Sequence, residues 1–423
     1  MNYFLERLSI VFGDPALRRR IGITLGILIL FRFVATIPIP GIDTTRLAEF
    51  LSGNSFFGLL NIFSGGGLSN LSIVMLGVGP YITGSIIMQL LTIVFPKVKE
   101  MYQEGGEAGK RKFTQYSRLL SIPLGLFQGF GLLTLLGNQG VLIDLSLFER
   151  AANVIVITAG SVFLMWLGEL ITEYGIGNGV SLLIFAGIVA GIPTTLSQVF
   201  LTFDISQIPL YLGFLLLSIA IVGAIVYITE AERPIPITYA KRVRGMKVYG
   251  GVSTYLPIRV NQAGVIPIIF ALSLLLFPQL VATGLSQMNS EVAIKISDFL
   301  LFLTTNPWVY SITYFVLVFG FTYFYTAITF DPENIAENLQ KSGAFVPGVR
   351  PGRPTALYIN RVLTRLTLVG ALFLGAIAVL PLILQAITGN PALAIGGTGL
   401  LIVVSVALEL LKQIDAQATM REY

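Results

Sequence analysis

Residues 56–95 read FFGLLNIFSGGGLSNLSIVMLGVGPYITGSIIMQLLTIVF, and this uncharged stretch decides the fold. A transmembrane helix needs roughly 20 apolar residues, so the stretch is too long for one span. The run SGGGLSN at 64–70 breaks it in the middle. A short apolar piece, 56–63, therefore precedes a full span, and this piece is too short to cross a bilayer.

Two interpretations of residues 56–63 follow from their length. Non-spanning backbone at membrane depth is tolerated where it is buried in protein or lines an aqueous cavity, which predicts a re-entrant half-helix in a vestibule. The alternative is an amphipathic helix lying on the membrane surface. The glycines after the piece leave it hinged and favour the first interpretation, a plug at about 56–69.

The rest of the chain is also predominantly apolar. Hydrophobic residues make up 54% and charged residues 12% of it, against roughly 25% charged in soluble domains. The apolar runs are too long and continuous for the alternating strands of a transmembrane barrel. We predict ten transmembrane helices, at 21–39, 71–95, 119–136, 151–171, 180–201, 208–229, 262–284, 309–329, 362–385 and 393–411.

Basic residues alternate between the loops. Of the 27 Lys and Arg, 23 fall in the N-terminal segment, the loops near 96–118, 230–260 and 329–365, and the C-terminal tail. The intervening loops hold only Arg46, Arg150 and Lys295. Positive charge stays on the cytoplasmic side during insertion, so we expect both termini to be cytoplasmic. The first run follows Arg18–Arg20 as in a signal peptide, but no cleavage site follows, so we expect a retained span.

Ten spans divide into two sets of five, 1–205 and 206–423. An odd number of spans in each set places the second set upside down relative to the first, which permits an inverted repeat with a pathway between the halves. The predicted fold class is therefore an all-α polytopic membrane protein. Its ten helices form two pseudo-symmetric inverted halves of five, with a re-entrant plug half-helix.

Two basic loops differ from ordinary connections. The loop at 231–260 mixes β-branched, aromatic and basic residues, which predicts a projecting hairpin with a basic tip near Gly245. The loop at 329–361 predicts a short helix that Asp331 and Pro332 begin, followed by glycine and proline turns. Two structured projections on one face suggest docking of a large partner. Positive-inside charge without a partner remains the alternative.

The residues that several kinds of catalysis and metal binding require are absent from the sequence. Cys is absent and so is His, which removes thiolate nucleophiles, imidazole bases and most metal ligation. The run EGGEAGKRK at 104–112 fails the Walker pattern twice. We predict neither a cofactor nor an enzyme. An intramembrane enzyme is a weak alternative because no nucleophile and base stand together.

Charged residues inside the spans are few. Arg32, Glu169 and Glu409 are the candidates, and no span holds two central carboxylates, which argues against an ion relay. Arg32 either lines a pathway or is satisfied by carbonyls or a glutamate. An apolar pathway suits a variable, often hydrophobic substrate and seals by dewetting. The alternative is a secondary transporter of small solutes.

A series of motifs resembles the SecY family, the channel subunits of bacterial protein translocases. The resemblance runs from about residue 18 to the C-terminus and keeps the order of the spans. The motifs are IPIPGID (37–43), NIFSGGGLS (61–69), LGVGPYITGSIIMQLLT (76–92), FLMWLGELITEYGIGNGVSLLIFAGIVAG (163–191), YAKRVRG (239–245), STYLPIRVNQAGVIPIIFA (253–271), KSGAFVPGVRPG (341–352), TRLTLVGALFLG (364–375) and GGTGLLIVV (396–404).

The resemblance implies an hourglass channel that exports unfolded preproteins and inserts membrane proteins, powered by SecA or the ribosome. A lateral gate is implied between the spans at 71–95 and 119–136 and those at 262–284 and 309–329. The implied pore ring is Val78, Ile82, Ile184, Ile269 and Ile402. The implied plug residues are Leu59, Leu60, Asn61, Ile62 and Phe63, and the implied docking residues are Lys241, Arg242, Arg244, Lys247 and Arg350.

The resemblance also implies partners and a location. The partners are SecE-like and SecG-like small subunits, the SecA motor ATPase, the ribosome, and signal peptides with nascent chains. The implied location is the bacterial inner membrane, with a thylakoid membrane as the alternative. The basic loops suit contact with anionic lipids. Val78 is smaller than the isoleucine often found there, and the loops at 137–150 and 285–307 are short for the family.

Overall fold

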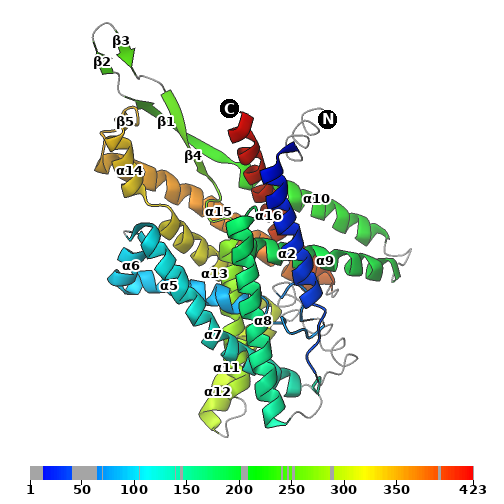
Figure 1. The fold of residues 1–423 in the computed structure, drawn as a ribbon. Helices are drawn as coiled ribbons and strands as arrows, with labels where there is room; N and C mark the ends of the chain where they lie inside the picture. Colours follow the sequence, from blue (N-terminus) through cyan, green and yellow to red (C-terminus); the bar gives the residue numbers. More distant parts are fainter. Residues whose placement is uncertain are drawn as a thin grey trace.

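The protein is a helical bundle with a β-hairpin projecting from one end (Figure 1). The start of the first described helix and the end of the last lie at the same end as the hairpin. The structure is a computed structural model that describes residues 13–40, 64–68, 70–103, 105–138, 140–142, 146–201, 208–239, 242–244, 247–249, 253–285, 290–388 and 392–422.

Within the residues that the structure describes, each predicted span overlaps one helix, and three further helices connect them. The connecting helices are α6 (Pro96–Gln103), α12 (Glu291–Thr305) and α14 (Pro332–Lys341). The helices that overlap predicted spans are α2 (Pro15–Val34), α5 (Gly79–Val94), α7 (Gly106–Asn138), α8 (Leu147–Tyr174), α9 (Gly179–Leu201), α10 (Ile208–Glu230), α11 (Ile266–Leu285), α13 (Pro307–Thr329), α15 (Arg353–Thr388) and α16 (Ala392–Glu422).

Length and apolar composition support part of the span prediction. Within the described residues, four helical segments are long and apolar enough to cross a membrane, at 106–137, 147–174, 307–341 and 353–385. The pair α5 and α6, bent by 113°, makes a fifth if counted as one span. Shorter apolar helices lie at 179–193, 215–230 and 266–279. The chain is therefore multi-pass, and the count of ten stays a prediction.

Several predicted boundaries are wrong. The span expected at 71–95 becomes helical only at Gly79, because residues 71–73 pair with the extended segment 37–39. Ile39 N donates to Leu71 O at 2.9 Å, and Ile73 N donates to Ile37 O at 3.0 Å. At the other end of the chain, α15 begins nine residues before 362 and α16 continues past 411 to Glu422. These helices extend into the basic loops because charge does not end a helix.

Helix starts follow their local sequence. The Asp331 carboxylate accepts hydrogen bonds from Glu333 N and Asn334 N, and Pro332 occupies the first turn of α14, as predicted. At the start of α8, Ser146 and Glu149 form a capping box. Both helices begin where polar side chains satisfy the free backbone N–H groups.

The two basic loops form a single body, which we call the basic appendage (232–259 and 332–350). β1 (Glu232–Tyr239) pairs with β4 (Ser253–Arg259), and β2 (Arg242–Arg244) pairs with β3 (Lys247–Tyr249), which confirms the predicted hairpin. The short strand β5 (Ala344–Phe345) of the second loop also pairs with β1. A small apolar core of Ile235, Ile258, Val346, Ile359 and Leu363 fixes the appendage to α15.

The main apolar core joins residues from both predicted halves. It includes side chains from α2, α5, α8 and α9 and from α10, α11, α13, α15 and α16. α5 and α7 contact α11 on one side, and α9 contacts α16 on another. The interior between the halves is therefore the place where a pathway would run.

Candidate functional site

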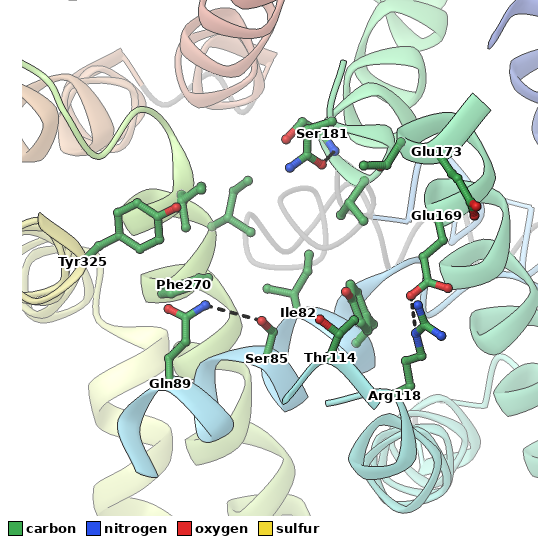
Figure 2. A pocket seen from close by; sticks show the side chains of 16 residues that line it. Ile82, Ser85, Gln89, Thr114, Arg118, Glu169, Glu173, Ser181, Phe270 and Tyr325 are labelled. Atoms are coloured by element: carbon green, nitrogen blue, oxygen red, sulfur yellow. Dashed lines mark hydrogen bonds and ion pairs between the residues drawn. The ribbon is translucent and has the colours of Figure 1, made fainter. Parts of the chain in front are cut away.

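A cavity of about 470 Å³ opens between the two predicted halves (Figure 2). Its lining comes from α5, α7, α8 and α9 of the first half and from α11 and α13 of the second. The residues from α7, α11 and α13 lie near the ends of these helices that adjoin the basic loops, and those from α8 and α9 lie beside the turn at 175–178. The lining residues are Tyr81, Ile82, Ser85, Gln89, Thr114, Arg118, Glu169, Thr172, Glu173, Asn178, Val180, Ser181, Ile266, Ile269, Phe270 and Tyr325.

Part of the cavity lining is polar. Arg118 Nε of α7 donates to Glu169 Oε1 of α8 at 2.5 Å, and Gln89 Nε2 donates to Ser85 Oγ at 3.4 Å (Figure 2). The Arg118 and Glu169 side chains are 43% and 23% exposed, so water reaches them. Among the described residues no cluster of three potential metal ligands occurs. The cavity suits a hydrated, unspecific passage more than a built ligand site.

The inner part of the cavity is apolar and meets the predicted ring. Ile82 and Ile269 line the cavity, and each is 5% exposed. Val78, Ile184 and Ile402 are each 1% exposed. All five belong to one buried apolar cluster, to which α5, α9, α11 and α16 contribute. The structure therefore buries all five predicted ring residues in the same apolar cluster, and their arrangement as a ring stays a prediction.

The segment before α5 is irregular and buried. Ser64 and Leu68 are 1% and 0% exposed, so this part of the chain does not lie on the surface as an amphipathic helix would. Ser161 Oγ of α8 donates to Gly77 O at 2.8 Å. The predicted plug residues Leu59, Leu60, Asn61, Ile62 and Phe63 lie outside the described residues.

Of the alternatives considered for Arg32, the structure shows a hydrogen bond to a backbone carbonyl. The Arg32 Nη1 donates to Gly65 O at 2.6 Å, in the turn at the end of the predicted plug segment 56–69. Glu169, the second charged candidate, pairs with Arg118. Glu409 accepts a hydrogen bond from Gln413 Nε2 at 3.4 Å. The ion pair between Arg118 and Glu169 was not predicted, because the residues lie 51 positions apart in a sequence without periodic charge.

The predicted lateral gate corresponds to a continuous seam. α5 and α7 contact α11 there, and α11 contacts α13. The rings of Phe127 on α7 and Phe277 on α11 stack across the seam with centroids 6.4 Å apart. Thr83 Oγ1 on α5 accepts a hydrogen bond from Gln128 Nε2 on α7 at 3.4 Å. The bond between Thr83 and Gln128 lies within the first half, whereas the stacked rings of Phe127 and Phe277 join the two halves across the seam.

The predicted docking residues lie on the basic appendage. Arg242 and Arg244 belong to β2 and Lys247 to β3, at the end of the hairpin far from the bundle (Figure 1), whereas Lys241 lies outside the described residues. Arg350 is exposed in the turn before α15, and its carbonyl accepts a hydrogen bond from Thr355 Oγ1 at 2.8 Å. The pairing of β5 with β1, which the sequence did not predict, joins the two docking loops.

Comparison with known sequences gives one consistent family. A family model described as SecY matches residues 72–411. The protein translocase subunit SecY of Halalkalibacterium halodurans is 46% identical over 427 residues, covering 98% of each chain. The protein translocase subunit SecY of Streptomyces coelicolor is 43% identical over 429 residues, covering 97% of each chain.

Solved structures share the fold at lower identity. A structure described as a protein conducting channel and another described by the plug domain of SecY each match with a TM-score of 0.67, at 21% identity over 96% of this chain and 93% of theirs. Sec61 in a canine ribosome–channel complex matches with a TM-score of 0.63, at 20% identity with the same coverage.

Proposed function

The chain belongs to the SecY family, and from that membership we infer that it is the channel-forming subunit of a protein translocase. It is a multi-pass membrane protein and not an enzyme. Its task is to let unfolded polypeptides cross a membrane and to release apolar segments into it. The secondary transporter considered from the sequence is excluded by this membership.

One observation supports the passage between the halves above all others. The lining of the cavity combines polar side chains such as Arg118 and Glu169 with Ile82 and Ile269, which also belong to the buried apolar cluster. A narrow apolar throat offers water and ions no hydrogen-bond partners, so it stays closed when empty. Apolar contact is non-directional, so the same side chains accommodate many passing sequences.

We propose that Val78, Ile82, Ile184, Ile269 and Ile402 form the ring of the constriction, and that residues 56–69 form a plug on its non-cytoplasmic side. The burial of the described end of that segment supports the plug. One structural relative is a SecY protein whose plug domain is described as stabilising the closed state of its channel. We further propose that the chain works as two halves, 1–205 and 206–423, which separate at the seam between α5, α7, α11 and α13.

We propose that the basic appendage docks the SecA motor and the ribosome. Its support is a projection with a three-stranded sheet (β4, β1 and β5), a separate two-stranded sheet (β2 and β3) and the helix α14, with basic residues in β2 and β3 and at Arg350. The canine relative is described in a complex with a ribosome. Charged side chains on a projecting hairpin steer large partners with opposite charge and add little to the stability of the bundle.

We propose SecE-like and SecG-like small membrane subunits as constant partners, and signal peptides with nascent chains as transient ones. Exposed apolar side chains on α2 and α10, among them Ile29, Phe33, Leu216 and Ile219, leave room for lipid or for a partner helix. We propose that both termini lie in the cytoplasm of a bacterial cell, which the positions of the basic loops support; these loops also suit contact with anionic lipids. A thylakoid membrane is the alternative location.

Reconstitution tests the function directly. Proteoliposomes that contain this chain, a SecE-like subunit and SecA should protect a labelled precursor from added protease when ATP is present. Matched vesicles that lack this chain supply the control. A precursor that stays fully digestible in the complete vesicles with ATP would contradict the proposal, provided that SecA hydrolyses ATP and that this chain is folded in the vesicles.

A further inference from the structure

Arg32 is a charged side chain deep inside α2 that the proposed function leaves unused. It follows Arg20 by 12 residues, so it lies about 18 Å further along the helix at a rise of 1.5 Å per residue. A charge at such depth is costly and marks a functional position unless its partners are purely structural. Among the described residues, no carboxylate forms an ion pair with Arg32.

The partner of Arg32 is the turn at Ser64–Leu68. Gly65 and Gly66 have φ angles of 65° and 82°, in the left-handed region that favours glycine. Leu68 N donates to Ser64 Oγ at 2.9 Å, and Gly67 N donates to Ser64 O at 3.2 Å. These bonds close the turn, and the carbonyl of Gly65 points to the guanidinium of Arg32.

The turn lies between two helices of the first half. A Cβ atom at Gly65 would overlap the ring of Phe31 on α2, and a Cβ atom at Gly187 on α9 would overlap the backbone of Gly65. Close approach of glycine backbones lets the turn fit, but such packing is non-directional. The hydrogen bond from Arg32 is charge-assisted and directional, so it fixes the position of the turn between the helices.

We propose that Arg32 is a positioning residue for the closed channel, which holds the turn at Ser64–Leu68 against α2 and α9 until a polypeptide enters. The proposal rests on the proposed plug, because the turn is the end of the chain segment 56–69. A charged hydrogen bond suits this task, since it is strong when formed and can be exchanged for carbonyls of a passing chain. An apolar side chain at position 32 would offer no such exchange.

We call the hydrogen bond from Arg32 to Gly65 O the latch, and three substitutions at position 32 test it. Arg32→Met removes charge and donors, Arg32→Gln keeps an amide donor, and Arg32→Lys keeps the charge. With hydrogen bonds to charged groups as the basis, we expect Arg32→Met to raise the resting ion conductance of the channel in planar bilayers roughly tenfold. Arg32→Gln and Arg32→Lys should give smaller increases. A conductance of Arg32→Met equal to that of the parent, with the protein folded, would overturn the proposal.

A readout of the turn itself separates a latch from general loosening. The chain has no cysteine, so Leu68→Cys introduces a single thiol in the turn, at a site that is 0% exposed, and keeps the hydrogen bond from the backbone of residue 68 to Ser64 Oγ. Adding Arg32→Met or Arg32→Gln should speed alkylation of this thiol severalfold. Ser311→Cys in α13, at 5% exposure, is the matched control and should react at an unchanged rate. Equal acceleration at both sites would mean that Arg32 only stabilises the bundle, and would overturn the latch.

Combination with a deletion distinguishes failure of the latch from failure of the plug. If Arg32 acts through the turn, then Arg32→Met should add no conductance to a variant that lacks residues 58–66. Additive conductance would overturn the latch and leave the plug intact. A deletion variant that is folded and remains sealed would instead remove the proposed plug, and the latch with it.

Discussion

The five proposed ring residues in the interior are at most 5% exposed, whereas Arg350 and the outer residues of β1 and β4 in the basic appendage face solvent. The interior cluster joins helices from both predicted halves, while the appendage has its own small core around Ile235 and Ile258. The two regions are thus held by separate sets of contacts. We expect the interior to control the seal and the appendage to control docking, with little influence of one on the other.

Of all the predicted changes, deleting residues 58–66 should have the largest effect on the seal and none on docking. The deletion removes most of the proposed plug together with part of the glycine turn, so the resting ion conductance should rise at least roughly tenfold because the vestibule loses its filling. Binding of SecA to the appendage should not change. Conductance across planar bilayers and SecA co-sedimentation with proteoliposomes measure the two quantities. Loss of SecA binding by a folded deletion variant would show that the regions are coupled.

Arg350→Glu should produce the opposite pattern. A reversed charge at a docking surface should slow SecA-driven export roughly tenfold, since Arg350 is exposed and contributes little to folding. The resting conductance should equal that of the parent. Protease protection of a precursor measures export, and Arg353→Glu, three residues further along, supplies a nearby charge control. Normal export by the Arg350→Glu variant would remove this residue from the docking surface.

Lys412→Ala should have the smallest effect. Lys412 Nζ on α16 and Glu230 Oε1 on α10 lie 2.8 Å apart, and the side chains are 38% and 42% exposed. Such solvent-screened pairs contribute less than about 1 kcal/mol to stability. We expect export and resting conductance to match the parent, with a shift of at most a few degrees in thermal unfolding. A severalfold change in conductance would show that the end of α16 belongs to the gate.

Much of the fold could be predicted from hydropathy and charge. The order of the helices, the hairpin at 231–260 and the helix begun by Asp331 agree with the structure. The segment at 71–78 could not be predicted, because its apolar residues resemble a helix by composition. Pairing of residues 71–73 with 37–39 is a tertiary contact that overrides this local preference. The strand β5 could not be predicted either, because a strand of two residues is too short to show a periodic pattern.

The candidate site divides in a similar way. The ring residues were named from a resemblance. All five lie in the main buried cluster, but that they form a ring stays a prediction. The ion pair of Arg118 with Glu169 and the bond of Arg32 to Gly65 O depend on how distant segments meet. The spacing of residues in the sequence does not predict contacts between distant segments. Charged residues inside spans therefore indicate that a site exists, but not which residues they contact.

The most direct test of the account replaces Ile82 and Ile269 together by serine. These two side chains line the cavity and also belong to the buried apolar cluster, so hydroxyl groups at both positions should let water enter the throat. Conductance of the reconstituted resting channel in planar bilayers is the measurement, with the double substitution Ile221→Ser and Val318→Ser, in the same cluster but away from the cavity lining, as control. We predict a severalfold rise for Ile82→Ser with Ile269→Ser, retained export, and no rise for the control. A folded Ile82→Ser and Ile269→Ser variant that conducts no more than the parent would contradict the account, because the gate would then lie elsewhere.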